Sequence, residues 1–278
     1  MVLFPNAKIN LGLCVTARRP DGYHDLSTVM LPTGWCDVLE IVPGRGEDHT
    51  LTVSGRAVDC PPEKNLVMKA LRALESETGP LAPVDIYLEN IIPDGAGLGG
   101  GSADAAFTLR GLNEVLGLGL DDGRLAAVAA RVGADCPFFI YNRPALCTGT
   151  GTDVSPMEIP SLAGFTLAIA KGRGGSVSTA EAYRGITPRR PEHDPRETVA
   201  LPPAEWAWRL VNDFEPTVFA ALPAVAALKQ HMYDSGAVYA SMSGSGSAVY
   251  GIFTDDKLAR RALGRLTDCD TWCGAALV

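Results

Sequence analysis

The chain has 278 residues, of which 46% are hydrophobic and 20% are charged, and its net charge at neutral pH is -8. This length and composition are typical of a globular protein with one large domain or two modest ones. The excess of acidic residues argues against nucleic acid and against a membrane surface as partners, because both are negatively charged. A bound phosphate group must therefore be held by local N–H groups and single cations.

The seven cysteines are scattered and form no Cys-x-x-Cys pair. We interpret them as reduced thiols of a cytoplasmic protein. Cys269 and Cys273 have no histidine nearby in the sequence, so we expect no metal site there. Lys8 stands where a signal peptide would need its apolar core, and no apolar run reaches the roughly 18 residues of a membrane span. We therefore expect the protein to stay in the compartment where it is made.

Residues 8–15 alternate between apolar and polar positions, which predicts a β-strand. Lys8 and Asn10 share one face of this strand with Gly12. Solvent exposure is the default interpretation of a single lysine on a strand. A surface that faces a ligand would need the same arrangement, so both interpretations stay open at this point.

The Pro-Asp-Gly stretch at residues 20–22 is typical of a turn. Tyr23 and His24 follow it, either as the end of a surface hairpin or, together with Lys8, as part of a ligand-binding loop. An antiparallel-looking run of short strands with glycine-rich turns is predicted next, at residues 28–31, 38–42 and 51–54. A helix with one apolar face is predicted to begin after Asn65.

Residues 92–106 connect a predicted strand at 84–88 to a predicted helix that begins at Ser102 and ends at Gly117. Five glycines lie within seven consecutive positions of this connection. Glycine permits positive φ angles and lets a ligand approach main-chain N–H groups closely. A helix N-terminus adds unpaired N–H groups and the positive end of the helix dipole. The sequence therefore predicts a phosphate-binding loop.

Two other interpretations of this glycine loop are weaker. A flexible linker is not normally bracketed by a hydrophobic strand and the start of a helix. A Rossmann dinucleotide site has a spacing that Gly95, Gly97 and Gly100 match, but its loop opens the first βα unit and an acid ends the second strand. Here a long stretch of other structure precedes the loop, and the next acids, Asp121 and Asp122, lie in a turn.

A further helix is predicted from Asp122 to a stop at Gly133. Asp135 follows, between this stop and the apolar run at residues 136–140. A carboxylate in such a place is costly to bury unless it is hydrogen-bonded or used in chemistry. Capping of the next turn and a functional role are therefore equally compatible with the sequence.

Residues 148–152 form a predicted loop to a second half of the chain, which gives domains at residues 1–152 and 153–278. The second half follows a βαββαβ pattern when one extra helical segment at residues 205–210 is set aside. This pattern is typical of a ferredoxin-like domain. The predicted strands lie at residues 165–170, 238–242, 247–253 and 271–278.

Two segments of the second half are candidate contacts for a ligand. Ser178 and Glu181 match a capping box, which places Thr179 and Tyr183 at the beginning of a helix. Residues 242–247 form a loop of small residues between the two central strands. A hairpin turn explains this loop as well as a ligand contact does.

Three separated motifs resemble those of the galactokinase, homoserine kinase, mevalonate kinase and phosphomevalonate kinase (GHMP) superfamily, at residues 5–11, 93–106 and 242–247. Residues 19–24 and 133–139 resemble one branch of this superfamily. The resemblance covers nearly the whole chain. It implies an α+β protein with an N-terminal α/β domain like ribosomal protein S5, joined to the ferredoxin-like half, and an active site in the cleft.

The resemblance implies a small-molecule kinase that transfers the γ-phosphoryl group of ATP, with Mg²⁺, to the tertiary hydroxyl group of a cytidine-diphosphate-linked alcohol. Asp135 matches the catalytic aspartate and Lys8 its lysine partner. The implied substrate contacts are Asn10, Tyr23, His24, Asp135, Thr179 and Tyr183, with two aromatic rings flanking the cytosine. The implied ATP contacts are Asn65 near the adenine and Pro93, Asp94, Gly95, Ala96, Gly97, Leu98, Gly99, Gly100, Gly101, Ser102 and Ala103.

These residues suit the implied chemistry. Phosphoryl transfer needs mainly positioning and charge stabilisation, which an N–H cradle, a helix N-terminus and Mg²⁺ supply. Asp135 can accept the proton of a hydroxyl nucleophile, and Lys8 would orient the carboxylate and hold it ionised. The sequence assigns no metal ligand. Many relatives carry a lysine just before the loop proline, whereas this chain has Asn90, Ile91 and Ile92 there. This departure concerns the implied adenine contacts.

Two rival hypotheses belong beside this one. Another GHMP kinase, acting on a small alcohol or sugar, would not need Tyr23, His24 and Tyr183 for binding. A catalytically silent sensor with the same fold should have lost the Lys8 and Asp135 pair, which this chain retains. For the assembly, we expect a monomer or a weak homodimer.

Overall fold

The computed structural model describes residues 1–57, 60–175 and 177–277, which form two compact units. Unit 1 contains Met1–Ala7, Trp35–Asp94 and Gly99–Asn142, whereas unit 2 contains Lys8–Gly34, Gly95–Leu98 and Arg143–Val278. The chain passes repeatedly between the units, and the predicted boundary at residues 152 and 153 stays a prediction. Val278, where the last predicted strand ends, lies outside the described residues.

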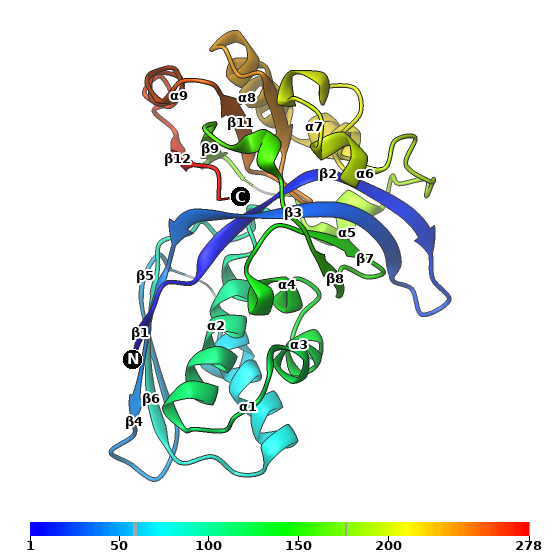
Figure 1. Ribbon diagram of the computed structural model, residues 1–278. Helices are drawn as coiled ribbons and strands as arrows, with labels where there is room; N and C mark the ends of the chain where they lie inside the picture. The colour runs from blue at the N-terminus through cyan, green and yellow to red at the C-terminus, as the bar shows by residue number, and fades with distance from the viewer. Residues whose placement is uncertain (58–59, 176, 278) are drawn as a thin grey trace. The chain divides into compact units, whose positions relative to one another are not determined.

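Unit 1 contains a four-stranded sheet in the order β1-β4-β6-β5 (Figure 1). Its strands are β1 (Val2–Leu3), β4 (Val38–Pro43), β5 (Thr50–Gly55) and β6 (Val84–Asn90). β4 pairs antiparallel with β1 and β6, but β5 runs parallel to β6. The predicted antiparallel arrangement is therefore wrong for β5. The reason is that a helical crossover lies between β5 and β6, and a parallel neighbour needs such a connection.

Four α-helices complete unit 1 in the part of the chain that the structure describes, with a 3₁₀ turn, η1 (Pro62–Lys64), before the first. They are α1 (Leu66–Thr78), α2 (Gly100–Val115), α3 (Asp122–Ala130) and α4 (Cys136–Tyr141). α2 packs on β4, and α1 packs on α2 (Figure 1). Gly111 allows α2 to approach the sheet, because a Cβ atom there would lie 2.7 Å from a side-chain carbon of Ile41. The predicted helix starts at Asn65 and at Asp121 and Asp122 are confirmed, and the side chains of Asn65 and Asp121 cap α1 and α3.

Unit 2 contains two four-stranded sheets. The first has the order β2-β3-β7-β8 and consists of β2 (Asn6–Arg18), β3 (His24–Cys36), β7 (Ala145–Thr148) and β8 (Asp153–Pro156). β7 and β8 pair antiparallel, so residues 148–152 form a hairpin turn within this sheet. β2 and β3 are longer than the strands predicted at residues 8–15 and 28–31. Each continues beyond the segment in which apolar and polar residues alternate.

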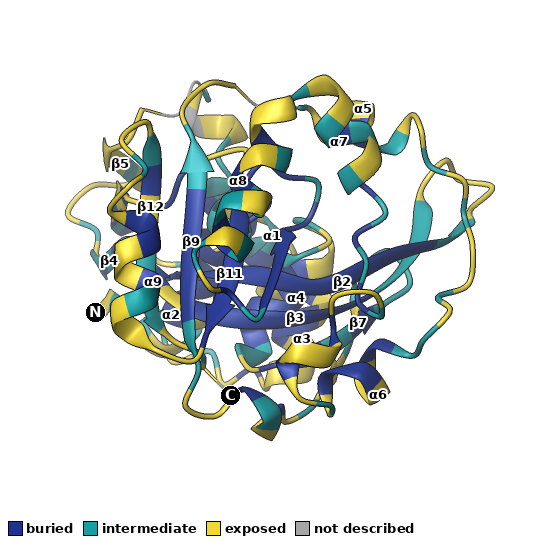
Figure 2. Ribbon diagram, turned by 90° about the horizontal axis from the view of Figure 1, so that it is seen from above, coloured by how far each residue is buried: buried dark blue, intermediate teal, exposed yellow. Residues whose placement is uncertain are grey.

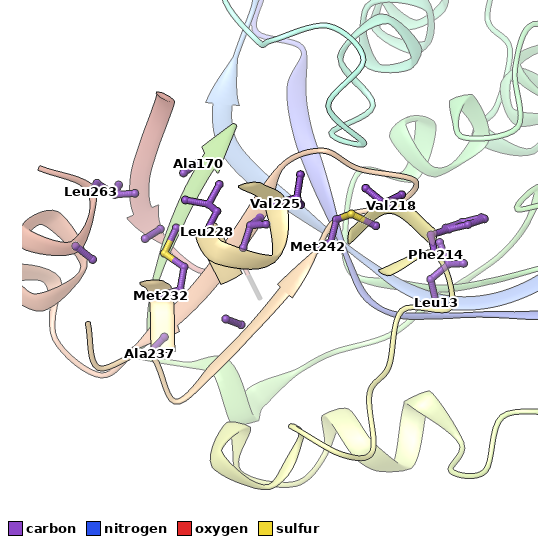
Figure 3. Packing of buried hydrophobic residues seen from close by; sticks show 14 of the residues in the cluster. Leu13, Ala170, Phe214, Val218, Val225, Leu228, Met232, Ala237, Met242 and Leu263 are labelled. Atoms are coloured by element: carbon purple, nitrogen blue, oxygen red, sulfur yellow. The ribbon is translucent and has the colours of Figure 1, made fainter. Parts of the chain in front are cut away.

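The second sheet of unit 2 has the order β10-β11-β9-β12, which confirms the predicted ferredoxin-like half. Its strands are β9 (Thr166–Gly172), β10 (Tyr239–Met242), β11 (Val249–Phe253) and β12 (Cys269–Ala275), and its two crossover helices are α8 (Pro223–Asp234) and α9 (Asp256–Leu263). Figure 2 shows β9 and β11 as buried strands beneath α8, whose outer side is exposed. Val225, Leu228 and Met232 of α8 recur at helical spacing and join the buried cluster drawn in Figure 3.

The remaining helical segments lie between β8 and α8. They are η2 (Pro160–Leu162), α5 (Thr179–Tyr183), α6 (Pro195–Val199), η3 (Pro203–Glu205) and α7 (Glu215–Ala221). The helix predicted at residues 205–210 is wrong. Turns replace it, because this segment wraps around the fully buried Trp206, whose indole N–H donates to the carbonyl of Leu201. None of the helices within the described ranges is long and apolar enough to cross a membrane.

Candidate active site

β2 places Lys8 and Asn10 in the interior of unit 2. Their exposed fractions are only 3% and 1%, so the structure excludes the surface interpretation of this strand. Lys8 Nζ donates a 2.7 Å hydrogen bond to Asn10 Oδ1, and Asn10 Nδ2 donates at 3.1 Å to Thr28 Oγ1. Thr28 in turn donates to the carbonyl of Gly12. A buried ammonium group needs such partners because desolvation of a charge is costly.

The first part of the glycine loop, Gly95–Leu98, also belongs to unit 2. Its carbonyl groups accept three hydrogen bonds from that unit: Ala248 N donates to Ala96 O at 3.0 Å, Ser243 Oγ to Gly97 O at 2.8 Å, and Lys8 N to Leu98 O at 2.8 Å. Gly97 has a φ of +73°, and a Cβ atom there would overlap the carbonyl oxygen of Ser243. The close approach of two backbones therefore requires glycine at position 97.

Ser243 lies in the small-residue loop that joins β10 to β11. This loop is a hairpin, since Met242 pairs with Val249, and it is also a structural contact of the glycine loop. The same Ser243 hydroxyl accepts a hydrogen bond from Asn10 N at 3.3 Å. One buried serine thus connects the strand that carries Lys8 to the segment of the glycine loop that contains Gly97.

Asn212 holds this hairpin in place, and the sequence reasoning missed it. Its Nδ2 donates to the carbonyl groups of Met242 and Gly244, both at 2.9 Å, and its Oδ1 accepts from Phe214 N at 3.0 Å. Both N–H donors and one lone pair of the oxygen are therefore used, and the side chain is buried. We infer that Asn212 fixes the conformation of residues 242–244.

Two neighbouring acids add to this anchor. Asp213 accepts from Val15 N at 2.8 Å and pairs with Arg189 at 3.0 Å. Glu215 accepts from Met242 N at 2.9 Å and pairs with Lys229 at 2.6 Å. A signal was present in the sequence, because Asn212, Asp213 and Glu215 stand close together at the start of α7 among apolar residues. Such residues are costly to bury unless they are paired.

His24 and Tyr183 lie against each other, with ring centroids 4.6 Å apart and planes inclined by 21°. The rings of Tyr183 and Phe214 form a T-shaped pair, with centroids 4.8 Å apart and planes inclined by 82°. A ring inserted between two aromatic faces needs them about 7 Å apart, twice the usual contact distance. Hence a base cannot lie between His24 and Tyr183 as they stand.

Two further predicted substrate contacts belong to unit 2. Tyr23 is exposed, at 67% of its surface, at the end of the turn formed by residues 20–22. Thr179 begins α5 after the confirmed capping box, and its hydroxyl lies 3.2 Å from that of Ser245. The hairpin contacted by Asn212 and the start of α5 are therefore adjacent. Whether these residues contact a substrate stays a prediction.

In unit 1 the second part of the glycine loop becomes the N-terminus of α2. The helix begins at Gly100, with Gly99 as N-cap at a φ of +73°, so Ser102 lies inside the first turn and not at the helix start as predicted. The hydroxyl of Ser102 is hydrogen-bonded to the thiol of Cys136. Burial raises the pKa of that thiol to about 12, so Cys136 stays protonated. Asn65 accepts a hydrogen bond from Val67 N as the cap of α1.

Asp135 immediately precedes α4 and is half-buried. Its side chain makes no capping hydrogen bond, so the structure excludes capping of the next turn as the role of this carboxylate. Asp135 belongs to unit 1 and Lys8 to unit 2. Their pairing stays a prediction.

The described residues include no group of three or more histidine, cysteine, aspartate or glutamate side chains that could hold a metal ion. Mg²⁺ bound with a nucleotide needs only one or two protein oxygens, because phosphate and water supply the others. Ser102 and Asp135 offer such oxygens. They lie in neighbouring parts of unit 1, since Ser102 Oγ is 3.9 Å from the Cβ position of Gly133. The side chains present therefore fit a nucleotide-bound Mg²⁺.

Two family models match this chain. Residues 65–143 match the GHMP kinases N terminal domain, and residues 202–269 match the GHMP kinases C terminal. The solved homoserine kinase from Cytophaga hutchinsonii has a TM-score of 0.72 at 18% identity, over 98% of this chain and 94% of that chain, which shows the fold alone. Fold and matched segments define a GHMP kinase, a small-molecule phosphotransferase.

Whole-chain relatives are more specific. The 4-diphosphocytidyl-2-C-methyl-D-erythritol kinases of Parabacteroides distasonis and Porphyromonas gingivalis are 47% and 45% identical, over 99% and 98% of both sequences. A crystal structure of 4-(cytidine 5'-diphospho)-2C-methyl-D-erythritol kinase has a TM-score of 0.85 at 32% identity and covers 100% of both chains. The chain belongs to the family of 4-diphosphocytidyl-2-C-methyl-D-erythritol kinases.

Proposed function

We propose that this kinase transfers the γ-phosphoryl group of ATP to the 2-hydroxyl group of 4-diphosphocytidyl-2-C-methyl-D-erythritol, giving ADP and the 2-phosphate product. This reaction is a step of the non-mevalonate (methylerythritol phosphate) route to isoprenoid precursors. The observation that supports the proposal is identity of 45% to 47% to kinases of that name along almost the whole chain.

The proposed reaction moves one proton and one phosphoryl group. The hydroxyl oxygen forms a bond to the γ-phosphorus, the bond from that phosphorus to the β–γ bridging oxygen breaks, and Asp135 accepts the hydroxyl proton. Lys8 contributes positive charge from a buried, hydrogen-bonded position, so little reorganisation is needed when negative charge shifts. Bound Mg²⁺ would neutralise charge on the phosphate oxygens.

The glycine loop would bind the phosphates of ATP through main-chain N–H groups and the N-terminus of α2. Its conformation suits this role: the carbonyl groups of Ala96, Gly97 and Leu98 are already engaged within unit 2. Gly99 ends the loop in a left-handed conformation directly before the helix. The proposed adenine contact is Asn65.

The cytidine end of the substrate would stack on Tyr183, with His24 reading the polar edge of the base. Asn10, Tyr23 and Thr179 would contact the remainder. The stack of His24 on Tyr183 supports a role in ring binding, because it places two aromatic rings together in unit 2, one of them in the segment that also contains Thr179. We also propose a cytoplasmic location and a monomeric or weakly dimeric state.

The test is an ADP-release assay on the purified protein with ATP and Mg²⁺. 4-Diphosphocytidyl-2-C-methyl-D-erythritol is offered beside mevalonate, homoserine and galactose as separate acceptors. We expect turnover on the cytidine compound alone. Turnover on another alcohol would retain the kinase chemistry but discard the cytosine contacts. No turnover on any acceptor would support the silent sensor.

A further inference from the structure

Two buried aspartates of unit 1 have no part in the chemistry described so far. Asp37 lies between β3 and β4 and is 2% exposed, and Asp104 lies in the second turn of α2 and is 4% exposed. Their side chains are hydrogen-bonded to each other. Burying two acids in contact with each other costs free energy unless their oxygens accept hydrogen bonds, for example from backbone N–H groups that lack another acceptor.

Asp37 accepts hydrogen bonds from two such N–H groups at the beginning of the glycine loop. Its Oδ1 accepts hydrogen bonds from Ile91 N at 2.5 Å and Ile92 N at 2.7 Å, directly after β6 ends at Asn90. These two N–H groups lie beyond the paired part of the sheet and need an acceptor. On the other side, Asp37 Oδ2 is 3.7 Å from the Cβ position of Gly100, where α2 begins.

The hydrogen bond between the acids requires one proton. Two carboxylates in contact cannot both be ionised without strong repulsion. Burial, and then the charge of Asp37, raises the pKa of Asp104 well above its usual range. Burial also raises the pKa of Asp37, but the hydrogen bonds from the N–H groups of Ile92 and Ile91 and from Asp104 oppose that rise. The proton therefore belongs on Asp104, which donates to Asp37. The other oxygen of Asp104, Oδ1, is buried and has no hydrogen-bond partner among residues 1–57, 60–175 and 177–277.

Two other titratable groups act on this pair. Burial raises the pKa of Asp37, and the guanidinium of Arg56 opposes this rise by attracting the carboxylate; Arg56 Nε also donates to the carbonyl of Ile91 at 2.7 Å. The thiol of Cys36 precedes Asp37, and burial together with that charge raises its pKa. Arg56 and the two N–H donors therefore stabilise a negative charge on Asp37 against the cost of burying it.

We propose that Asp37 and Asp104 form a one-proton positioning pair that joins the end of β6 to α2 and thereby sets both ends of the phosphate-binding glycine loop. That the glycine loop binds the phosphates of ATP rests on the proposed function. The pair contacts neither the nucleotide nor the reacting atoms. It acts through the backbone at Ile91 and Ile92 and through the position of α2.

The test compares Asp104→Asn and Asp104→Leu with the wild type, by direct titration of ATP binding from about pH 5 to about pH 9. An asparagine amide still donates to Asp37 but cannot ionise, whereas leucine cannot donate at any pH. Asp85→Asn is the matched control, because Asp85 belongs to β6 and its carboxylate accepts from Thr50 at the surface. No acceptor substrate is present, so turnover does not enter.

We expect the ATP affinity of the wild type to fall as the pH rises, because ionised Asp104 repels Asp37. Asp104→Asn should bind like the wild type at low pH and lose less affinity than the wild type as the pH rises, since only the titration of ATP itself is common to both. Asp85→Asn should follow the wild type. Asp104→Leu should bind ATP about tenfold more weakly at every pH, the scale of a lost charge-assisted hydrogen bond. Amide exchange at Ile91 and Ile92 should be faster in Asp104→Leu than in the wild type.

Equal pH dependence in the wild type and Asp104→Asn would overturn the shared proton. An Asp104→Leu protein that melts earlier but binds ATP normally would reduce the pair to a structural feature and overturn its positioning role. If Asp104→Leu does not fold, the pH dependence of ATP affinity in the wild type and in Asp104→Asn still tests whether the two acids share a proton that affects ATP binding. A wild type that binds no nucleotide at any pH would instead overturn the proposed function, and with it the phosphate role of the loop.

Discussion

Asp135 is the residue on which the proposed chemistry depends most directly. It is half-buried, precedes α4 and does not cap that helix, so its carboxylate is held by the fold without an evident structural task at the helix start. A general base lowers the barrier for proton removal in the transition state and adds little to ground-state binding.

Asp135→Ala should therefore lower kcat about a hundredfold or more, the usual scale of a general base, and leave ATP and substrate affinity nearly unchanged. Steady-state kinetics with both substrates varied give the separation of kcat from KM. Glu158→Ala serves as a control acid in the same chain. An unchanged kcat in Asp135→Ala would remove this residue from the mechanism.

Tyr183 is the second residue with a prediction at this scale. Its ring contacts His24 on one side and Phe214 at its edge, so its position is fixed before any ligand binds. Stacking of a base on an aromatic side chain contributes about 1–3 kcal/mol. This contribution should belong to the cytidine substrate and not to ATP.

Tyr183→Ala should raise the KM of the cytidine substrate by about tenfold, within the range of base stacking, with little change for ATP. Tyr183→Phe is the matched control, because it retains the ring, and it should behave like the wild type. Substrate and ATP titrations at saturating partner concentration measure both effects. An equal loss for the two ligands would refute the stacking assignment.

At the scale of elements, the glycine loop and the hairpin at residues 242–247 are close-packed against each other. The hydrogen bond from Ser243 to Gly97 and the missing Cβ atom at position 97 permit this contact. Asn212 supports the hairpin from behind with two donated hydrogen bonds. The two motifs thus form one structural unit around the backbone of Gly97.

Gly97→Ala should destabilise the protein by several kcal/mol and weaken ATP binding, because the new methyl group overlaps the carbonyl oxygen of Ser243. Gly119→Ala is the matched control: its φ is +69°, but nothing lies within 4 Å of its Cβ position. That variant should lose only about 1–2 kcal/mol from the left-handed conformation. Thermal unfolding and ATP titration measure the difference, and equal losses in the two variants would contradict the packing argument.

For the whole molecule, several acidic groups are buried in protonated form. Burial raises the pKa of Cys14 from its ordinary 9.0 to about 11 and that of Cys136 to about 12, and it also raises the pKa of Tyr239 and Tyr250. In the unfolded chain these groups ionise at their ordinary values. The stability they contribute is therefore fully present below about pH 9 and is lost as the pH rises through the folded-state values.

We expect the melting temperature to fall between pH 9 and pH 11, with each group contributing up to about 1.4 kcal/mol per pH unit. Cys136→Ala should show a shallower fall than the wild type, because one of the raised groups is absent. Calorimetry at several pH values gives the slopes. A melting temperature that stays constant over this interval would contradict the burial of these groups in protonated form.

Local signals in the sequence were sufficient for most elements. Asn65, Asp121 and Ser178 mark helix starts because each side chain caps a helix through contacts with its own neighbours. The βαββαβ order followed from hydrophobic periodicity, and the sheet order confirms it. The direction of β5 and the turns around Trp206 were predicted wrongly, because both depend on what the segment packs against.

The sequence by itself determined the family, the ferredoxin-like half and the glycine loop, because motif residues and hydrophobic spacing are local properties. Only the tertiary structure showed that Lys8 is buried, that Asn212 fixes the third motif, and that Asp37 and Asp104 share a hydrogen bond. The hydrogen bonds of Asn212 span 30 and 32 positions of the chain, and Asp37 and Asp104 are 67 positions apart. Such pairings depend on how the chain folds back on itself, which no local pattern of residues specifies.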